Sequence, residues 1–127
     1  MSPISSNSLY KVQPWLHRVP YKPFQHKLKV SVSEGIYLID FEDIVRVQAC
    51  GNYSIIHYKG GIITASKSLK HFENQLPNKQ FIRVHSSHLI ALQQIIFISK
   101  SEIKLKDGTF CPISRRGKAL LNELVKN

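Results

Sequence analysis

The sequence has 127 residues, of which 43% are hydrophobic, 9% aromatic and 20% charged. This composition suits one globular domain, and it excludes two ordinary domains as well as a largely disordered chain. Lysine and arginine number 18 against 8 aspartate and glutamate residues, a formal net charge of +10. Such an excess is uncommon in an enzyme with a neutral substrate and points to a polyanionic partner.

The N-terminal stretch differs from the rest in charge and in proline content. Residues 1–33 contain no acidic residue, and four prolines stand at positions 3, 14, 20 and 23. Such a segment cannot hold regular helix or strand pairing for long. We therefore expect residues 1–27 to form an extended basic arm ahead of a compact domain over 28–127. The arm is either a loose leader or a segment that follows a phosphate backbone or docks on a partner.

Short strands are predicted in quick succession after the arm. Alternating or β-branched runs predict strands over 28–32, 36–41, 45–50, 53–58 and 62–65, separated by glycine-containing turn signals. A helix is expected next, capped by Ser66 or Ser68, because apolar residues then recur at helical spacing before Pro77.

The C-terminal half continues with strands and closes on a second helix. Apolar runs predict strands over 81–84, 89–92, 95–98, 102–105 and 110–113. Ser114 is expected to cap a final helix with one apolar stripe, formed by Leu120, Leu121, Leu124 and Val125. Eight to ten short strands with turns at this spacing are typical of an all-β sandwich or barrel.

Support for catalysis is weak. The sequence has no Walker loop, nucleophile elbow, zinc-protease motif or dinucleotide fingerprint, and its few carboxylates stand mostly near predicted turns. His85 and His88 would point to opposite faces of a regular strand, although a tight turn would bring them together, and their spacing matches no metal motif. We predict no enzyme activity, no catalytic residue, no metal and no cofactor.

The cysteine count and the hydropathy pattern bear on location. Two cysteines are too few for a disulfide scaffold or a four-cysteine zinc site. No stretch approaches the roughly 20 apolar residues of a membrane span, and the N-terminus lacks the apolar core of a signal peptide. We expect a cytoplasmic protein with reduced thiols, no membrane association and no small-molecule substrate.

The segment Ser114-Arg115-Arg116-Gly117-Lys118 carries the clearest local signal. Cations at a helix N-terminus oppose the helix dipole at a cost of roughly 0.3–1 kcal/mol each. Two arginines there favour an anion that backbone N–H groups and guanidinium groups bind together, most simply a phosphate. Gly117 is expected to keep the surface open for close approach of that anion. The alternative is a solvated charge pair without a ligand.

Two further polar segments fit the same purpose. His85-Ser86-Ser87-His88 interrupts an apolar pattern just after Arg83, and its side chains can donate to phosphates or read base edges. The alternative is a loop in which the two histidines only form internal hydrogen bonds. In Gly51-Asn52-Tyr53, Asn52 tolerates a left-handed turn and its amide can bind adenine, although from this tripeptide alone a plain hairpin turn is the better explanation.

In order and spacing, these segments resemble those of LytTR-type DNA-binding domains over about residues 28–127. The run 47–53 is similar to the family segment I-E-A-x-G-N-Y, and the run 81–88 to its F-x-R-V-H-R-S-Y signature. The run 107–116 resembles the family's closing motif, which ends in a serine and two arginines. Four residues depart from those usual in the family: Gln48, Ser86, His88 and Ala91.

The resemblance implies a mainly β fold, with antiparallel β-sheets of about ten short strands and two short helices. It implies binding of double-stranded DNA through loops set into the major groove, in bacterial transcription regulation related to two-component systems. It also implies a homodimer or two protomers on repeated sites. No receiver domain fits within residues 1–27, so phosphorelay control inside this chain is not expected.

The leading hypothesis is therefore a sequence-specific duplex-DNA-binding transcription regulator. The predicted DNA-binding residues come from the three polar segments: Asn52, Tyr53, Arg83, His85, Ser86, His88, Ser114, Arg115, Arg116 and Lys118. The alternative is a non-enzymatic protein-interaction module of the same fold that modulates another regulator and binds DNA weakly and nonspecifically. The short side chains of Ser86 and Ala91 favour that alternative. A third interpretation, single-strand binding, requires exposed aromatic residues, which the strand pattern does not predict.

Overall fold

The strands and helices of the computed structural model follow the predicted order. The structure describes residues 22–126. The ten strands within these residues are β1 (Lys27–Val32), β2 (Gly35–Asp40), β3 (Ile44–Cys50), β4 (Tyr53–Tyr58), β5 (Gly61–Ala65), β6 (Phe81–His85), β7 (His88–Ala91), β8 (Ile95–Ile98), β9 (Glu102–Leu105) and β10 (Phe110–Pro112). In the same described part of the chain, the α-helices are α2 (Leu69–Gln75) and α3 (Arg115–Val125), and the two short 3-10 helices are η2 (Phe41–Asp43) and η3 (Leu92–Gln94).

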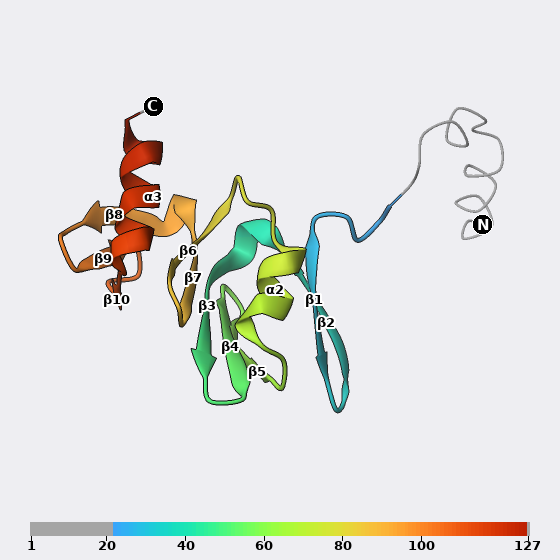
Figure 1. Cartoon of the computed structure of the whole chain (residues 1–127). Coiled ribbons are helices and arrows are strands. Elements are labelled where there is room, and N and C mark those ends of the chain that lie inside the picture. The colour runs from blue at the N-terminus through green and yellow to red at the C-terminus, as the bar shows by residue number, and fades with distance from the viewer. Residues whose placement is uncertain (1–21, 127) are drawn as a thin grey trace, which may run out of the picture.

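The strands form three antiparallel sheets (Figure 1). A two-stranded ribbon pairs β1 with β2, a five-stranded sheet has the order β5-β4-β3-β7-β6, and a three-stranded sheet has the order β10-β9-β8. The predicted fold class, antiparallel β-sheets of about ten short strands with two helices, is confirmed. Of the sandwich or barrel that turn spacing alone favoured, the barrel does not form, because the strands divide among three separate sheets. The three-stranded sheet instead packs over one face of the five-stranded sheet.

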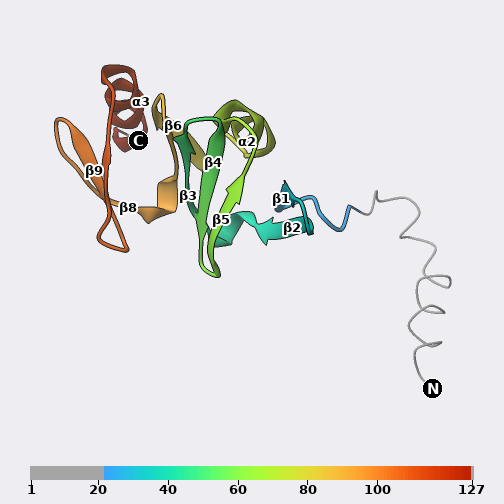
Figure 2. The ribbon, with the colours of Figure 1, turned by 90° about the horizontal axis from the view of Figure 1, so that it is seen from below.

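The five-stranded sheet separates two hydrophobic cores. Figure 2 shows α2 and the β1–β2 ribbon on one side of this sheet and the three-stranded sheet and α3 on the other. On one face, α2 and the β1–β2 ribbon cover a core that includes Val47, Phe72 and Phe81. On the other face, the three-stranded sheet and α3 cover a core that includes Ile82, Ile90 and Leu121. Neighbouring residues of β6 thus enter opposite cores, as expected for side chains that alternate along a strand.

Helix α2 is built as the sequence predicts. Its cap is Ser68 rather than Ser66, since the Ser68 side chain accepts a hydrogen bond from the His71 backbone N–H at 3.1 Å. Leu69 and Phe72 are buried against the sheet. The helix ends at Gln75, before Pro77.

Helix α3 begins as predicted but buries less of its apolar stripe. Of the four stripe residues only Leu121 is buried, whereas Leu120, Leu124 and Val125 are 45%, 49% and 68% exposed. The reason is the helix face used for packing: Gly117 and Leu121, four residues apart, are its buried residues. Leu120 and Leu124 form a neighbouring row along the same helix.

The expectation of buried aromatic residues is only partly met. Phe97 and Phe110 are 56% and 53% exposed. Lys104 of β9 is the cross-strand partner of Phe110 on β10 and of Phe97 on β8. All three side chains therefore share the outer face of the three-stranded sheet. Strand periodicity alone does not show which face of a three-stranded sheet remains uncovered.

The predicted boundary between the N-terminal arm and the compact domain stays a prediction. Of the arm predicted over 1–27, residues 1–21 lie outside the described part of the chain, and Lys27 is the first residue of β1. Between them, the His26 carbonyl accepts a hydrogen bond from the Phe41 backbone N–H at 3.0 Å. No helix among residues 22–126 has the length and apolar character needed to cross a membrane.

Candidate nucleic-acid interface

The β6–β7 turn is a tight hairpin of two serines. His85 and His88 are cross-strand partners on either side of Ser86 and Ser87, and their rings lie 5.6 Å apart, edge to face. The Ser87 backbone N–H donates to His85 Nδ1 at 3.1 Å. The tight turn therefore brings together two histidines that a regular strand would separate. No cluster of three or more metal-ligating side chains exists among the described residues.

Arg83 links this turn to α2. Its guanidinium donates to Glu73 Oε1 of α2 at 2.9 Å and to the Ser86 carbonyl oxygen at 2.7 Å. Two of its donors are thus engaged within the protein. Arg83 fixes the position of Ser86 relative to α2, whereas the Ser86 side chain is exposed.

The N-terminus of α3 is attached to the end of β6. The Ser114 side chain accepts a hydrogen bond from the Gly117 N–H at 3.0 Å, so the predicted N-cap is confirmed. Ser114 also donates to the Val84 carbonyl oxygen, from its backbone N–H at 2.8 Å and from its hydroxyl at 3.2 Å. These bonds place the first turn of α3 one residue away from His85.

The four residues that follow Ser114 differ in their contacts. Arg115 and Arg116 are exposed, whereas Lys118 Nζ donates to the Ser99 carbonyl oxygen at 2.6 Å and so ties α3 to the loop after β8. The prediction for Gly117 is wrong. Gly117 is buried, and a Cβ atom built there would lie 2.7 Å from the Val84 carbonyl carbon. It permits close packing of α3 on β6 rather than close approach of an anion.

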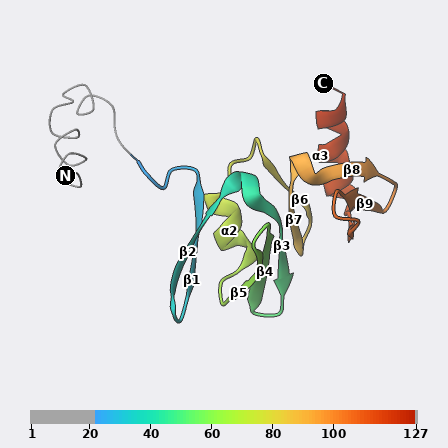
Figure 3. The same ribbon diagram turned by 180° about the vertical axis from the view of Figure 1, so that it is seen from behind.

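The β3–β4 turn lies beside the β6–β7 turn. The Ala49 N–H donates to the Ser87 carbonyl oxygen at 2.9 Å, which joins the end of β3 to the serine hairpin. In this turn Gly51 adopts the left-handed conformation, with φ of 60°, and Asn52 does not. Asn52 is exposed and Tyr53 is 53% exposed. Figures 1 and 3 show both turns at the same end of the five-stranded sheet.

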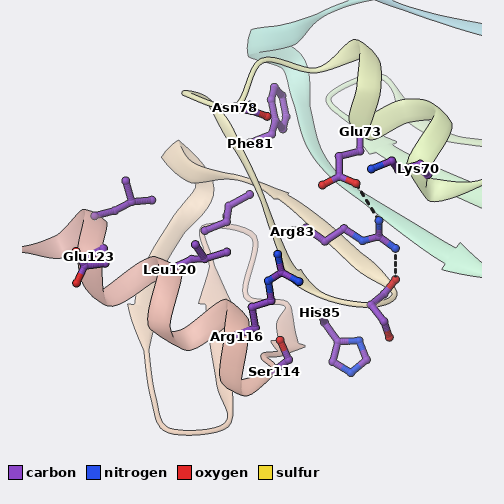
Figure 4. Close-up of a pocket in the computed structure, with 13 residues that line it drawn as sticks. Lys70, Glu73, Asn78, Phe81, Arg83, His85, Ser114, Arg116, Leu120 and Glu123 are labelled. Carbon is purple, nitrogen blue, oxygen red and sulfur yellow. Dashed lines mark hydrogen bonds and ion pairs between the residues drawn. The ribbon is translucent and has the colours of Figure 1, made fainter.

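A groove lies between α2, β6 and α3 (Figure 4). Its volume is about 790 Å³, and Arg83, His85, Ser86, Ser114 and Arg116 all line it. Five of the ten predicted DNA-binding residues therefore share one concave surface. The β3–β4 turn does not line this groove. The Ala49–Ser87 hydrogen bond and the pairing of β3 with β7 hold it beside the serine hairpin.

Lys70 is a cationic lining residue that the sequence did not predict as part of the site. Lys70 of α2 lies across the groove from α3. Its position in the predicted helix could be read from the sequence, but the side of the sheet on which α2 packs could not. Helical spacing fixes which residues share a helix face and leaves open which distant strand that face meets.

A polar cluster lies next to the histidine pair on the same sheet face. Gln48 is the cross-strand partner of His88, and its Oε1 accepts from Arg46 at 3.1 Å and lies 3.4 Å from His57 Nε2. Burial lowers the pKa of His57, and the nearby Arg46 adds to this effect. Burial also lowers the pKa of His88, with smaller contributions from His85, Arg46 and His57.

These lowered pKa values predict acid sensitivity of the fold. Below a pH of about 6.5, His57 and His88 become protonated in the unfolded chain while they stay neutral in the folded chain. The free energy of unfolding therefore falls as the pH drops. The loss should level off below the folded pKa values. Urea unfolding of the wild type at pH 7.5 and 5.5 measures the loss.

The matched comparison uses glutamine substitutions. The double variant His57→Gln/His88→Gln should lose less stability between the two pH values than the wild type does. His71→Gln, which removes an exposed imidazole from α2, controls for loss of a histidine elsewhere. An equal pH dependence in the wild type and the double variant would contradict the prediction.

Comparisons with known proteins identify the family. The model of the LytTR family, described as the LytTr DNA-binding domain, matches residues 34–126. A solved LytTr DNA-binding domain from Bacillus cereus is 21% identical and shares the fold, with a TM-score of 0.67 over 79% of this chain and 96% of that one.

Two curated relatives are longer proteins. Sensory transduction protein LytT of Bacillus subtilis (strain 168) is 32% identical over 106 residues, which cover 80% of this chain and 44% of that protein. The heme-containing CO-sensing transcriptional regulator RcoM 2 of Paraburkholderia xenovorans (strain LB400) is 31% identical over 119 residues, or 89% and 45%. The chain thus spans less than half the length of these relatives. Because the family model matches residues 34–126, the chain belongs to the LytTR family of DNA-binding domains of transcriptional regulators.

Proposed function

We propose that this chain binds duplex DNA in a sequence-specific manner, with the β3–β4 turn, the β6–β7 turn and the N-terminus of α3 set into the major groove. The observation that carries the proposal is their attachment to one another. The Ala49–Ser87 hydrogen bond joins the first two, and the Ser114–Val84 hydrogen bonds join the third. Segments distant in the sequence are thus held together by backbone contacts.

The exposed side chains divide by chemistry. Arg116 carries a guanidinium fork that matches guanine O6 and N7 or a phosphate, and Asn52 carries an amide that matches adenine. Ser86 reaches less far, which favours a phosphate contact. Arg83 and Lys118 already donate within the protein, so their proposed role is to hold the serine hairpin and α3 in place.

The surplus positive charge supplies affinity without sequence preference. A net charge of +10 attracts the phosphate backbone and releases counterions on binding, so the affinity should fall steeply with salt. Sequence preference must then come from the few exposed side chains at the turns. We also propose that two protomers bind repeated sites and that this binding serves transcription regulation.

Selection from a pool of random duplexes tests the proposal. Recovery of a defined motif, bound at least a thousandfold more tightly than scrambled duplex at the same salt concentration, is the expected result. Enrichment without a motif, together with binding that disappears by moderate salt, would favour the protein-interaction alternative. Tighter binding to the single strand would instead favour the exposed Phe97 and Phe110 as stacking surfaces.

A further inference from the structure

The groove between α2, β6 and α3 has an apolar wall that duplex binding does not need. Leu120 and Leu124, one helical turn apart on α3, line it at 45% and 49% exposure. Phe81 and Ile82 of β6 line the same groove. Leucine side chains contribute nothing to contact with phosphate, and exposed apolar surface inside a concave site is typical of ligand binding.

The charged side chains that line the groove are three cations and two carboxylates, which leaves a positive excess. Glu73 pairs with Arg83 at 2.9 Å, and Glu123 pairs with Lys126 at 3.5 Å. Within residues 22–126, Arg116 and Lys70 make no ion pair and no side-chain hydrogen bond. Figure 4 shows Arg116 on the α3 side and Lys70 on the α2 side of the groove. Two uncompensated cations thus stand beside an apolar wall.

We propose that this groove binds a monomeric anionic amphiphile, a carboxylate on a single alkyl chain. Its carboxylate lies between Arg116 and Lys70, and its chain runs along Leu120 and Leu124. The volume of about 790 Å³ lies in the usual range of small-molecule sites. Because Arg116 and Ser86 belong to the proposed DNA surface, an occupant of the groove competes with duplex DNA. This competition rests on the proposed function, whereas the binding itself does not.

Calorimetric titration of the full chain with decanoate, kept below micelle formation, tests the binding. We expect one site per chain and an affinity that rises roughly three- to fourfold for each methylene added from octanoate to decanoate. Decyltrimethylammonium, which has the same chain and the opposite charge, should bind at least tenfold more weakly. Equal binding of both amphiphiles, or no dependence on chain length, would overturn the inference.

A pair of variants on α3 locates the site. Leu124→Gln should weaken decanoate binding by about tenfold, because a leucine contact is lost. Val125→Gln is the matched control, since Val125 is 68% exposed and does not line the groove. Equal effects of the two substitutions, or none, would overturn the placement.

Competition separates this inference from the proposed function. Decanoate should weaken duplex binding by the wild type and do so less in Leu124→Gln, whose own duplex affinity should match that of the wild type. Strong duplex binding that decanoate leaves unchanged would overturn the competition alone. Absence of specific duplex binding, with decanoate binding retained, would instead count against the proposed function.

Discussion

Replacing Gly117 with alanine is expected to destabilise the fold by about 3 kcal/mol, the high end for an overpacked core position. The added Cβ would lie 2.7 Å from the Val84 carbonyl carbon and 2.8 Å from Val84 Cα, with the carbonyl oxygen closer still. These are backbone atoms of β6, so α3 must move away as a whole. The Ser114–Val84 hydrogen bonds lie at the same contact and would be strained with it.

The sign of this effect makes the test sharp. A glycine-to-alanine change inside an unconstrained helix stabilises by roughly 0.5–1 kcal/mol. Urea unfolding followed by circular dichroism should therefore show a lower midpoint for Gly117→Ala and a slightly higher one for Asn122→Ala, an exposed position on the same helix. An unchanged or raised midpoint for Gly117→Ala would mean that α3 does not pack closely on β6.

Arg116→Ala is expected to weaken specific duplex binding by about 1–3 kcal/mol, which corresponds to roughly a 5- to 150-fold loss of affinity. Arg116 is exposed and free of internal ion pairs within the described residues, so its removal should leave stability nearly unchanged. Fluorescence anisotropy with a labelled duplex, at several salt concentrations, measures the loss. The salt dependence reports whether a phosphate contact is lost as well.

Two comparison variants separate shape from charge. Arg116→Lys keeps the charge without the guanidinium fork, so a base contact predicts that it fails to restore affinity. Lys100→Ala removes one positive charge from an exposed position between β8 and β9 and should change affinity much less. Equal losses for Lys100→Ala and Arg116→Ala would reduce the role of Arg116 to its share of the overall charge.

Local signals were sufficient to predict most of the fold. Glycine turns and two-residue periodicity located the hairpins. Serines marked the helix starts, Ser66 or Ser68 for the first helix and Ser114 for the second, because side-chain caps act within three residues. What failed depended on contacts between distant segments. The role of Gly117 is set by Val84, more than thirty residues earlier, and no local pattern contains that information.

The candidate site shows the same division. The sequence identified the polar segments, and the fold decided which side chains within them remain available. In the sequence, nothing distinguishes Arg83 and Lys118 from Arg116 as candidate DNA contacts. In the structure, however, Arg83 donates to the Ser86 carbonyl oxygen and Lys118 donates to the Ser99 carbonyl oxygen. The exposure of Leu120 and Leu124 on α3 could not be predicted either, because an apolar stripe has the same spacing whether its residues are buried or exposed.

Backbone amide chemical shifts, recorded by NMR during titration with a selected duplex, show which surface of the protein meets the DNA. The largest changes are expected in the β3–β4 turn, the β6–β7 turn and the first turn of α3, including Asn52, Ser86 and Arg116. Changes concentrated instead on the β1–β2 ribbon or on the outer face of the three-stranded sheet would contradict this expectation.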